Sequence, residues 1–87
     1  MDHAIAQYLE RIGDDCAAVL GPGMTVLGVE RAELDGIVRL QVRYQVRGDV
    51  HETVGAGDTV IAAHAALRRQ LIDDRLAIGF TELVNAR

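Results

Sequence analysis

A short glycine-rich segment, Gly55-Ala56-Gly57-Asp58-Thr59, holds the residue types best suited to binding an anion. A run typical of a β-strand precedes it, and a helical apolar pattern begins at Val60. Small residues at such a junction leave backbone N–H groups accessible at the positive end of the helix dipole, where a carboxylate is stabilised. We therefore predict residues 55–59 as ligand-binding. The alternative is that the glycines only turn the chain and that Asp58 or Thr59 caps the helix.

A second candidate surface is a row of arginines on one side of a predicted strand. Arg39, Arg43 and Arg47 alternate with apolar residues and are interleaved with Gln41 and Gln45. Guanidinium groups bind carboxylates with two parallel hydrogen bonds, so this face suits a carboxylate ligand or an acidic partner surface. The alternative is a solvated face on which glutamates of neighbouring strands balance the charge. The predicted interface residues, on this strand and at the start of the second helix, are Arg39, Arg43, Arg47, Val60 and Ile61.

The remaining reactive residue types form no catalytic or metal-binding pattern. Cys16 falls on the apolar side of a predicted helix, where a free cysteine behaves as a small hydrophobic residue. Neither His3 nor His51 stands at a helical metal-ligand spacing from His64. We predict no catalytic residue, no metal and no cofactor, and we interpret the protein as non-enzymatic.

Length and composition favour one small domain that pairs with a copy of itself. The 87 residues include no Trp and one Phe, so the core is built largely from small aliphatic side chains. A domain of this size buries only part of its surface, and a second copy would hide more. We predict a single domain over 1–87 and a homodimer.

Charge and cysteine content narrow the partners and the compartment. The formal net charge of −4 disfavours nucleic acid and anionic membranes. The single cysteine cannot form an internal disulfide. The chain also shows no secretory signal pattern and no apolar run of membrane-spanning length. We expect a soluble cytoplasmic protein that does not bind membranes.

The first half of the chain predicts a helix and then a strand pair. Apolar residues in steps of three and four predict a helix over 1–20, which Gly21-Pro22-Gly23 ends. A strand over 24–34 leads into the hairpin signal Asp35-Gly36. From Val38 to Val46 apolar and polar residues alternate, as in a half-buried strand. The apolar residues of the first helix are Ile5, Tyr8, Leu9, Ile12, Cys16, Val19 and Leu20.

The second half predicts a third strand, a helix and a fourth strand. A turn at Gly48-Asp49 precedes a short strand over 50–54, which the glycine-rich segment ends. A helix follows and ends at Asp73-Asp74, and alternation from Leu76 to Val84 predicts the last strand. The fold is therefore α+β, in the order α-β-β-β-α-β, with an antiparallel sheet and both helices on one face. The buried face of the second helix comprises Val60, Ala63, Leu67 and Leu71, widened by Ile61, Ala65 and Ile72.

Residues 24 to about 72 resemble the regulatory, or dimerisation, domain of 2-isopropylmalate synthases and related enzymes. The likeness is carried by the alternating strand Val38-Arg39-Leu40-Gln41-Val42, the polar turn around Gly48, and Val54-Gly55-Ala56-Gly57-Asp58-Thr59-Val60-Ile61-Ala62-Ala63-His64-Ala65. That family has a glycine-led turn there, then acidic and hydroxyl residues, paired aliphatics and an Ala-rich helix. The resemblance implies a unit of three strands and a helix that pairs with its counterpart and binds an amino acid at the junction.

The order helix, three strands, helix also resembles a double-stranded-RNA-binding domain, with residues 55–59 at the turn before the second helix. RNA binding in that family needs lysines at the start of this helix. Val60 and Ile61 stand there instead, and the net charge is negative, so nucleic acid is disfavoured.

These observations predict a small regulatory or interaction module that self-associates through its sheet or second helix and binds a small carboxylate metabolite, such as an amino acid, near residues 55–59. The alternative is an interaction or inhibitor protein that binds a larger protein partner without a small ligand.

Overall fold

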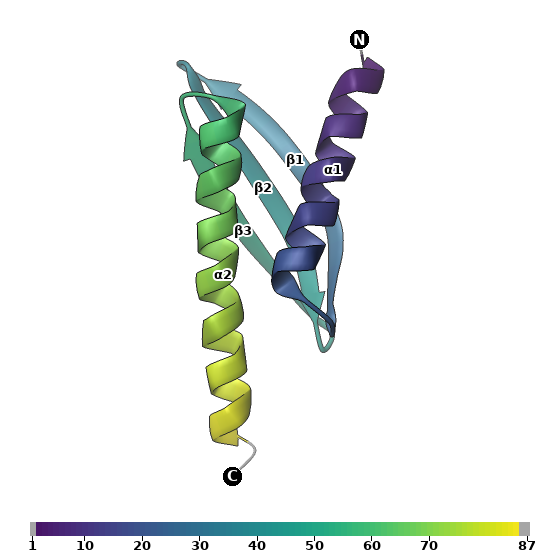
Figure 1. Ribbon diagram of the computed structural model, residues 1–87, viewed down its shortest axis with the longest axis vertical. Helices are drawn as coiled ribbons and strands as arrows, with labels where there is room; N and C mark the ends of the chain where they lie inside the picture. The colour runs from purple at the N-terminus through teal and green to yellow at the C-terminus, as the bar shows by residue number, and fades with distance from the viewer. Residues whose placement is uncertain (1, 86–87) are drawn as a thin grey trace.

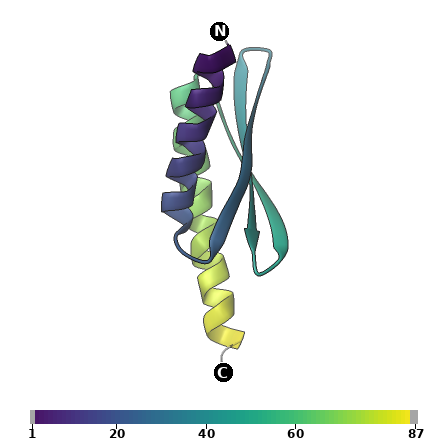
Figure 2. The ribbon, with the colours of Figure 1, turned by 90° about the vertical axis from the view of Figure 1, so that its right-hand side faces the viewer.

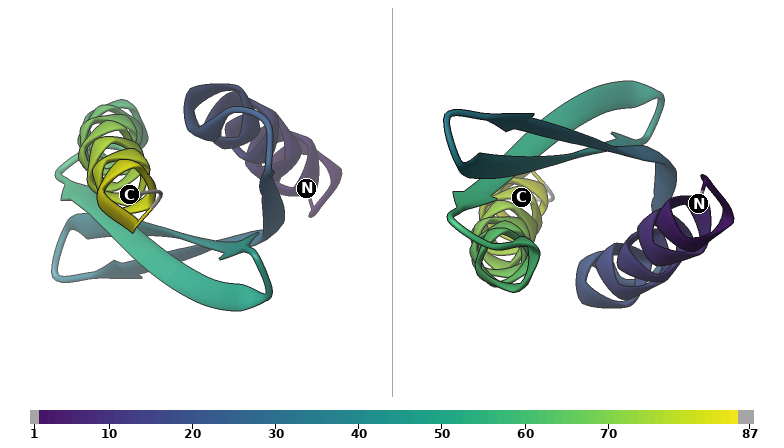
Figure 3. Two further views of the ribbon diagram at one scale, coloured as in Figure 1. Left: turned by 90° about the horizontal axis from the view of Figure 1, so that it is seen from below. Right: turned by 90° about the horizontal axis from the view of Figure 1, so that it is seen from above.

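The computed structural model describes the backbone of residues 2–85 and the side chains of residues 7–81. Its elements follow in the order α1 (Asp2–Leu20), β1 (Met24–Leu34), β2 (Ile37–Val46), β3 (Asp49–Gly57) and α2 (Val60–Asn85) (Figure 1). The strands form one antiparallel sheet in the order β1-β2-β3. Figure 2 and Figure 3 show that both helices lie on the same face of this sheet. The predicted α+β class and helix placement are confirmed.

The alternation of β2 decides which face of the sheet the helices cover. Every second side chain of this central strand, from Val38 to Val46, is buried beneath the helices. The intervening residues, among them Arg39 and Arg43, lie on the opposite face, which no described element covers. Pairing places Ala32 and Ala56 beside Arg39 on this open face.

Both hairpin turns use two residues with left-handed backbone conformations. Asp35 and Gly36 have φ values of 53° and 76°, and Arg47 and Gly48 have φ values of 52° and 87°. Two successive positive φ values match the right-handed twist of the strands. The Asp35-Gly36 turn is as predicted, whereas the second turn comes one residue earlier than predicted. Arg47 therefore lies in the turn and not on the strand beside Arg39 and Arg43.

The prediction that Gly55-Ala56-Gly57 interrupts the third strand is wrong, because β3 continues through Gly57. Gly55 pairs with Leu40 and Gly57 pairs with Val38. A Cβ atom at Gly55 would overlap the backbone N of Leu67 and lie 2.5 Å from the carbonyl oxygen of Ala63. These glycines therefore let α2 approach β3 more closely than any side chain would allow.

The core lies between the sheet and the two helices. Its buried members come from α1, β2 and α2, and apolar residues of β1 pack at its margin. The apolar side predicted for the first helix is confirmed where side chains are described, while the side chain of Ile5 lies outside the described residues. On the second helix, the prediction is confirmed for Val60, Ala63, Leu67 and Leu71. It is wrong for Ile61, Ala65 and Ile72, which are exposed. The buried hydrophobic residues are Ile12, Cys16, Leu20, Val38, Leu40, Val42, Tyr44, Val46, Ala63, Leu67 and Leu71.

The predicted end of the second helix at Asp73-Asp74 is wrong, and so is the predicted fourth strand over 76–84. Helix α2 continues through both regions to Asn85, a length of 26 residues. Its C-terminal part extends past the end of the sheet (Figure 1, Figure 2).

Helical spacing explains why the strand pattern misleads. Leu71, Asp74 and Ile78 stand three or four residues apart, and all three are turned toward the sheet. Leu76 and Phe80 lie four residues apart on the exposed side of the same helix. The alternating apolar residues Leu76, Ile78 and Phe80 therefore lie on two different sides of one helix: Ile78 faces the sheet, and Leu76 and Phe80 face away from it. The side chain of Val84, the last residue of that prediction, lies outside the described residues.

Candidate interaction surface

The predicted ligand segment is divided between the end of β3 and the start of α2. Gly55 and Gly57 face the helix, and Ala56 faces the open side of the sheet. Asp58 and Thr59 lie between the two elements. The hydroxyl oxygen of Thr59 accepts a hydrogen bond from the Ala62 N–H at 3.1 Å. Thr59 is thus the helix cap, and close packing with α2 accounts for the glycines.

The arginines predicted as interface residues occupy two different places. Arg39 and Arg43 lie on the open face of the sheet, where the Nε atom of Arg43 is 3.3 Å from a carboxylate oxygen of Glu52. The Gln41 amide donates to the other oxygen of Glu52 at 2.9 Å. A shallow hollow of about 150 Å³ lies between Arg39 and Val54. Cross-strand pairing thus balances the charge of Arg43, as the alternative interpretation of the sequence expects, whereas Arg39 has no ion pair among the described residues.

Val60 and Ile61, the other two predicted interface residues, face different directions. Val60 packs against the core and is partly buried. Ile61 points away from the sheet and is 83% exposed. Successive residues of a helix are separated by roughly 100°, so neighbours in sequence reach different surroundings.

Ile61 belongs to an apolar surface along α2, which we call the outer stripe and define as Ile61, Ala65, Ile72, Leu76 and Phe80. These residues fall on the side of the helix opposite Ala63, Leu67 and Leu71, which face the sheet. The exposed fractions are 45% for Ile72, 67% for Leu76 and 68% for Phe80. A contiguous exposed apolar surface of this kind is a candidate interaction site.

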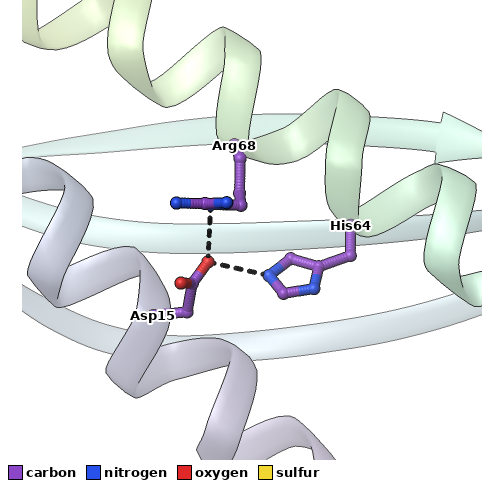
Figure 4. Close-up of polar contacts among 3 residues, drawn as sticks. All are labelled: Asp15, His64 and Arg68. Atoms are coloured by element: carbon purple, nitrogen blue, oxygen red, sulfur yellow. Dashed lines mark hydrogen bonds and ion pairs between the residues drawn. The ribbon is translucent and has the colours of Figure 1, made fainter.

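The flank of α2 that faces α1 is held by a polar cluster (Figure 4). One carboxylate oxygen of Asp15 lies 2.9 Å from Nε2 of His64 and 3.0 Å from Nε of Arg68. Two turns further along α2, Arg75 donates a hydrogen bond to the Val19 carbonyl at 3.1 Å. This flank is therefore occupied within the protomer, which leaves the outer stripe as the free apolar side of the helix.

The cluster has a histidine and a carboxylate but no available nucleophile. The neighbouring thiol of Cys16 is completely buried. Burial, and secondarily the charge of Asp15, raises the pKa of this thiol from 9.0 to about 11, against a smaller lowering by Arg68. Cys16 therefore stays protonated at neutral pH and is not a thiolate nucleophile. The role of the polar cluster that the contacts support is to connect α1 and α2.

A second polar cluster, which is partly buried, joins the middle of α2 to the sheet. One oxygen of the Asp74 carboxylate accepts hydrogen bonds from the Thr53 hydroxyl at 2.5 Å and from the Tyr44 hydroxyl at 3.2 Å. The Tyr44 ring stacks on His51 with centroids 5.3 Å apart. Burial is the largest cause of the raised pKa of Tyr44. Asp74 thus satisfies two hydroxyls that lie beneath the helix, so its role is structural.

The outer stripe does not follow from the sequence pattern. That pattern predicts Ile61, Ala65 and Ile72 on the buried face of the helix and Leu76 and Phe80 in a strand. The four-residue spacing of Ile72, Leu76 and Phe80 is the signal that could have extended the helix and revealed a second apolar side.

Within the described residues, no group of three or more histidine, cysteine, aspartate or glutamate side chains is placed to hold a metal ion. No helix in this part of the chain has the length and apolar character needed to cross a membrane. Comparisons with protein-family models, with curated proteins and with solved structures give no significant match.

Proposed function

We propose that this chain is a non-enzymatic interaction module that associates with a second copy of itself. The observation that carries the proposal is the outer stripe, where Ile61, Leu76 and Phe80 are each at least two-thirds exposed, at 83%, 67% and 68%. Removing one such side chain from water contributes about 1.5–3 kcal/mol. A surface that repeats this along one helix stabilises an assembly that covers it.

The architecture of the protomer supports the same conclusion. One sheet and two helices enclose a single core layer, and the aromatic content of the whole chain is 3%. Such a domain gains from burying further apolar surface on association. Its one cysteine is a free, buried thiol, which suits a reducing compartment such as the cytoplasm.

The open face of the sheet supports association less well than the outer stripe does. Its Arg43, Gln41 and Glu52 already satisfy one another, and burying them would require replacing their contacts with water. Carboxylate binding at residues 55–59 stays a prediction, since the Thr59 cap and close helix packing explain that segment without a ligand.

Light scattering with one pair of variants tests the proposal. The wild type is expected to show twice its chain mass of 9.4 kDa at high micromolar concentration. Leu76→Glu should be monomeric, because it places a charge in the outer stripe while Glu remains a good helix former. The matched control is Val50→Glu on the open sheet face, where Val50 is 49% exposed, and it should remain dimeric.

Three outcomes would contradict the proposal: a monomeric wild type, a dimeric Leu76→Glu, or dissociation by Val50→Glu alone. Far-UV circular dichroism of each variant verifies that the protomer is still folded.

A further inference from the structure

The spacing of the outer-stripe residues along α2 is symmetric about a midpoint. Together with Arg69, which lies on the same side, its positions are 61, 65, 69, 72, 76 and 80. The successive steps are four, four, three, four and four residues. The midpoint falls between Gln70 and Leu71.

Two-fold symmetry gives this pattern a physical meaning. A symmetric dimer uses the same patch on both copies, so residue i meets j and j meets i. When two α2 helices run antiparallel about an axis at the midpoint, Ile61 lies level with Phe80 of the second copy. Ala65 then lies level with Leu76, so a small side chain faces a large one. Ile72 lies level with the aliphatic stem of Arg69, which covers apolar surface while its charge stays in water.

The charges beside the stripe fit the same arrangement. Asp73 lies on the flank of α2 turned away from α1, and Arg69 lies beside it at the adjoining edge of the outer stripe. Among the residues that the structure describes, neither side chain has a hydrogen bond or an ion pair. In an antiparallel two-fold pair this flank meets its own copy, with Arg69 within one residue's rise of the level of Asp73. The contact occurs twice, once on each side of the axis.

The overhang of α2 also gains a partner in this arrangement. Its C-terminal part extends past the sheet with Leu76 and Phe80 uncovered (Figure 1). Antiparallel pairing lays that part along the N-terminal half of the other helix, which the sheet supports from behind. Parallel pairing would instead leave both overhangs together beyond both sheets and would place Arg69 beside Arg69.

We infer that the second copy docks through an antiparallel α2–α2 contact, centred between Gln70 and Leu71 and flanked by two Arg69–Asp73 ion pairs. This inference rests on the proposed self-association and specifies its orientation and register.

Cross-linking between single cysteines tests the register. Ala65→Cys and Leu76→Cys are made separately in a Cys16→Ala background, so each chain has one thiol. A short bis-maleimide reagent should join the two variants when they are mixed. It should not join Ala65→Cys to itself, because the two copies of residue 65 would be about 16 Å apart along the axis, at 1.5 Å per residue. Far-UV circular dichroism and light scattering establish that each variant is folded and dimeric before cross-linking.

The outcomes separate the two levels of the proposal. A wild-type protein that is monomeric by light scattering contradicts self-association itself. A dimer in which residue 65 cross-links to residue 65, or in which the mixture gives no heterodimer product, contradicts the antiparallel register only.

Charge exchange gives a second, independent test. Arg69→Glu and Asp73→Arg should each raise the dimer dissociation constant about threefold or more, since each places like charges together twice. The double variant should recover the wild-type constant within about twofold. Arg11→Glu on α1 controls for net charge and should leave the constant unchanged. Failure of the double variant to recover contradicts the predicted ion pairs.

Discussion

The two sides of α2 are both apolar, but the protomer covers only one of them. On the inner side, Ala63, Leu67 and Leu71 are completely buried against the sheet. On the outer side, Leu76 and Phe80 are about two-thirds exposed, at 67% and 68%. Apolar character therefore does not decide which side faces the sheet.

The residues across from the helix make that decision. Gly55 and Gly57 in β3 remove the side chains that would keep the helix away, and Asp74 on the inner side accepts two hydrogen bonds from the sheet. Among the described residues, no close-approach glycine and no buried polar contact faces the outer side. The comparison teaches that a helix with two apolar sides is oriented by close-approach sites and buried polar contacts, which leaves the other side available to a partner.

The largest expected effect comes from making the same substitution on each side. Leu67→Ala should lower the free energy of unfolding by about 4 kcal/mol, because it leaves a cavity in the core. Leu76→Ala should change it by less than about 0.5 kcal/mol, since its side chain is already exposed. Urea unfolding at low protein concentration measures both, because the dimer is then dissociated. Similar losses in the two variants would show that the sides are energetically alike.

A slightly smaller effect is expected from filling the close-approach site. Gly55→Ala should cost about 3 kcal/mol, because the added Cβ meets helix backbone that no rotamer change can move. Gly28→Ala is the matched control in β1, where the added Cβ meets nothing within 4 Å and φ is not positive. Thermal and urea unfolding compare the two. A tolerated Gly55→Ala would contradict the role assigned here to Gly55.

The smallest of these effects is a loss of stability at high pH. It arises from Cys16 in α1, so neither side of α2 is altered. The buried thiol of Cys16 keeps its proton to a pKa of about 11, whereas the unfolded thiol ionises near 9.0. Above pH 9 the folded state therefore binds more protons, and stability falls as the pH rises toward 11. The expected loss is about 2–3 kcal/mol, at 1.36 kcal/mol per pKa unit.

Unfolding free energies measured from pH 8 to 11 check this dependence. The free energy of unfolding of Cys16→Ala should fall less steeply with pH. The remaining fall includes a contribution from Tyr44, whose raised pKa acts in the same direction at higher pH. The outer stripe contains no group that titrates in this range. Identical slopes for the variant and the wild type would mean that the thiol does not contribute.

The sequence predicts the fold well where one periodicity dominates. The alternation of β2, the Asp35-Gly36 turn and the apolar side of α1 each follow from local rules, and the structure confirms them. The length of α2 could not be predicted in this way. Asp73-Asp74 is typical of a helix end, and Asp74 is tolerated inside α2 because Tyr44 and Thr53, distant in sequence, donate to it.

The candidate surface was harder to predict, because the same residues have alternative explanations. Gly55 and Gly57 suit an exposed turn as well as a close helix contact, and only the position of Leu67 and Ala62 distinguishes them. The sequence predicts Ile61 both as an interface residue and on the buried face of the helix, and ending the helix at Asp73-Asp74 hides its continuation through Leu76 and Phe80. Tertiary contacts, which local patterns do not contain, decide both cases.

The buried tyrosine beneath α2 gives the molecule an intrinsic optical reporter. The chain has no tryptophan and two tyrosines; Tyr44 is completely buried, whereas Tyr8 is partly buried at the margin of the core. Its ring rests on His51 and its hydroxyl reaches Asp74 in the middle of the long helix. Lifting that helix would release the ring into water and change its near-ultraviolet signal, so helix detachment can be followed in the unlabelled protein.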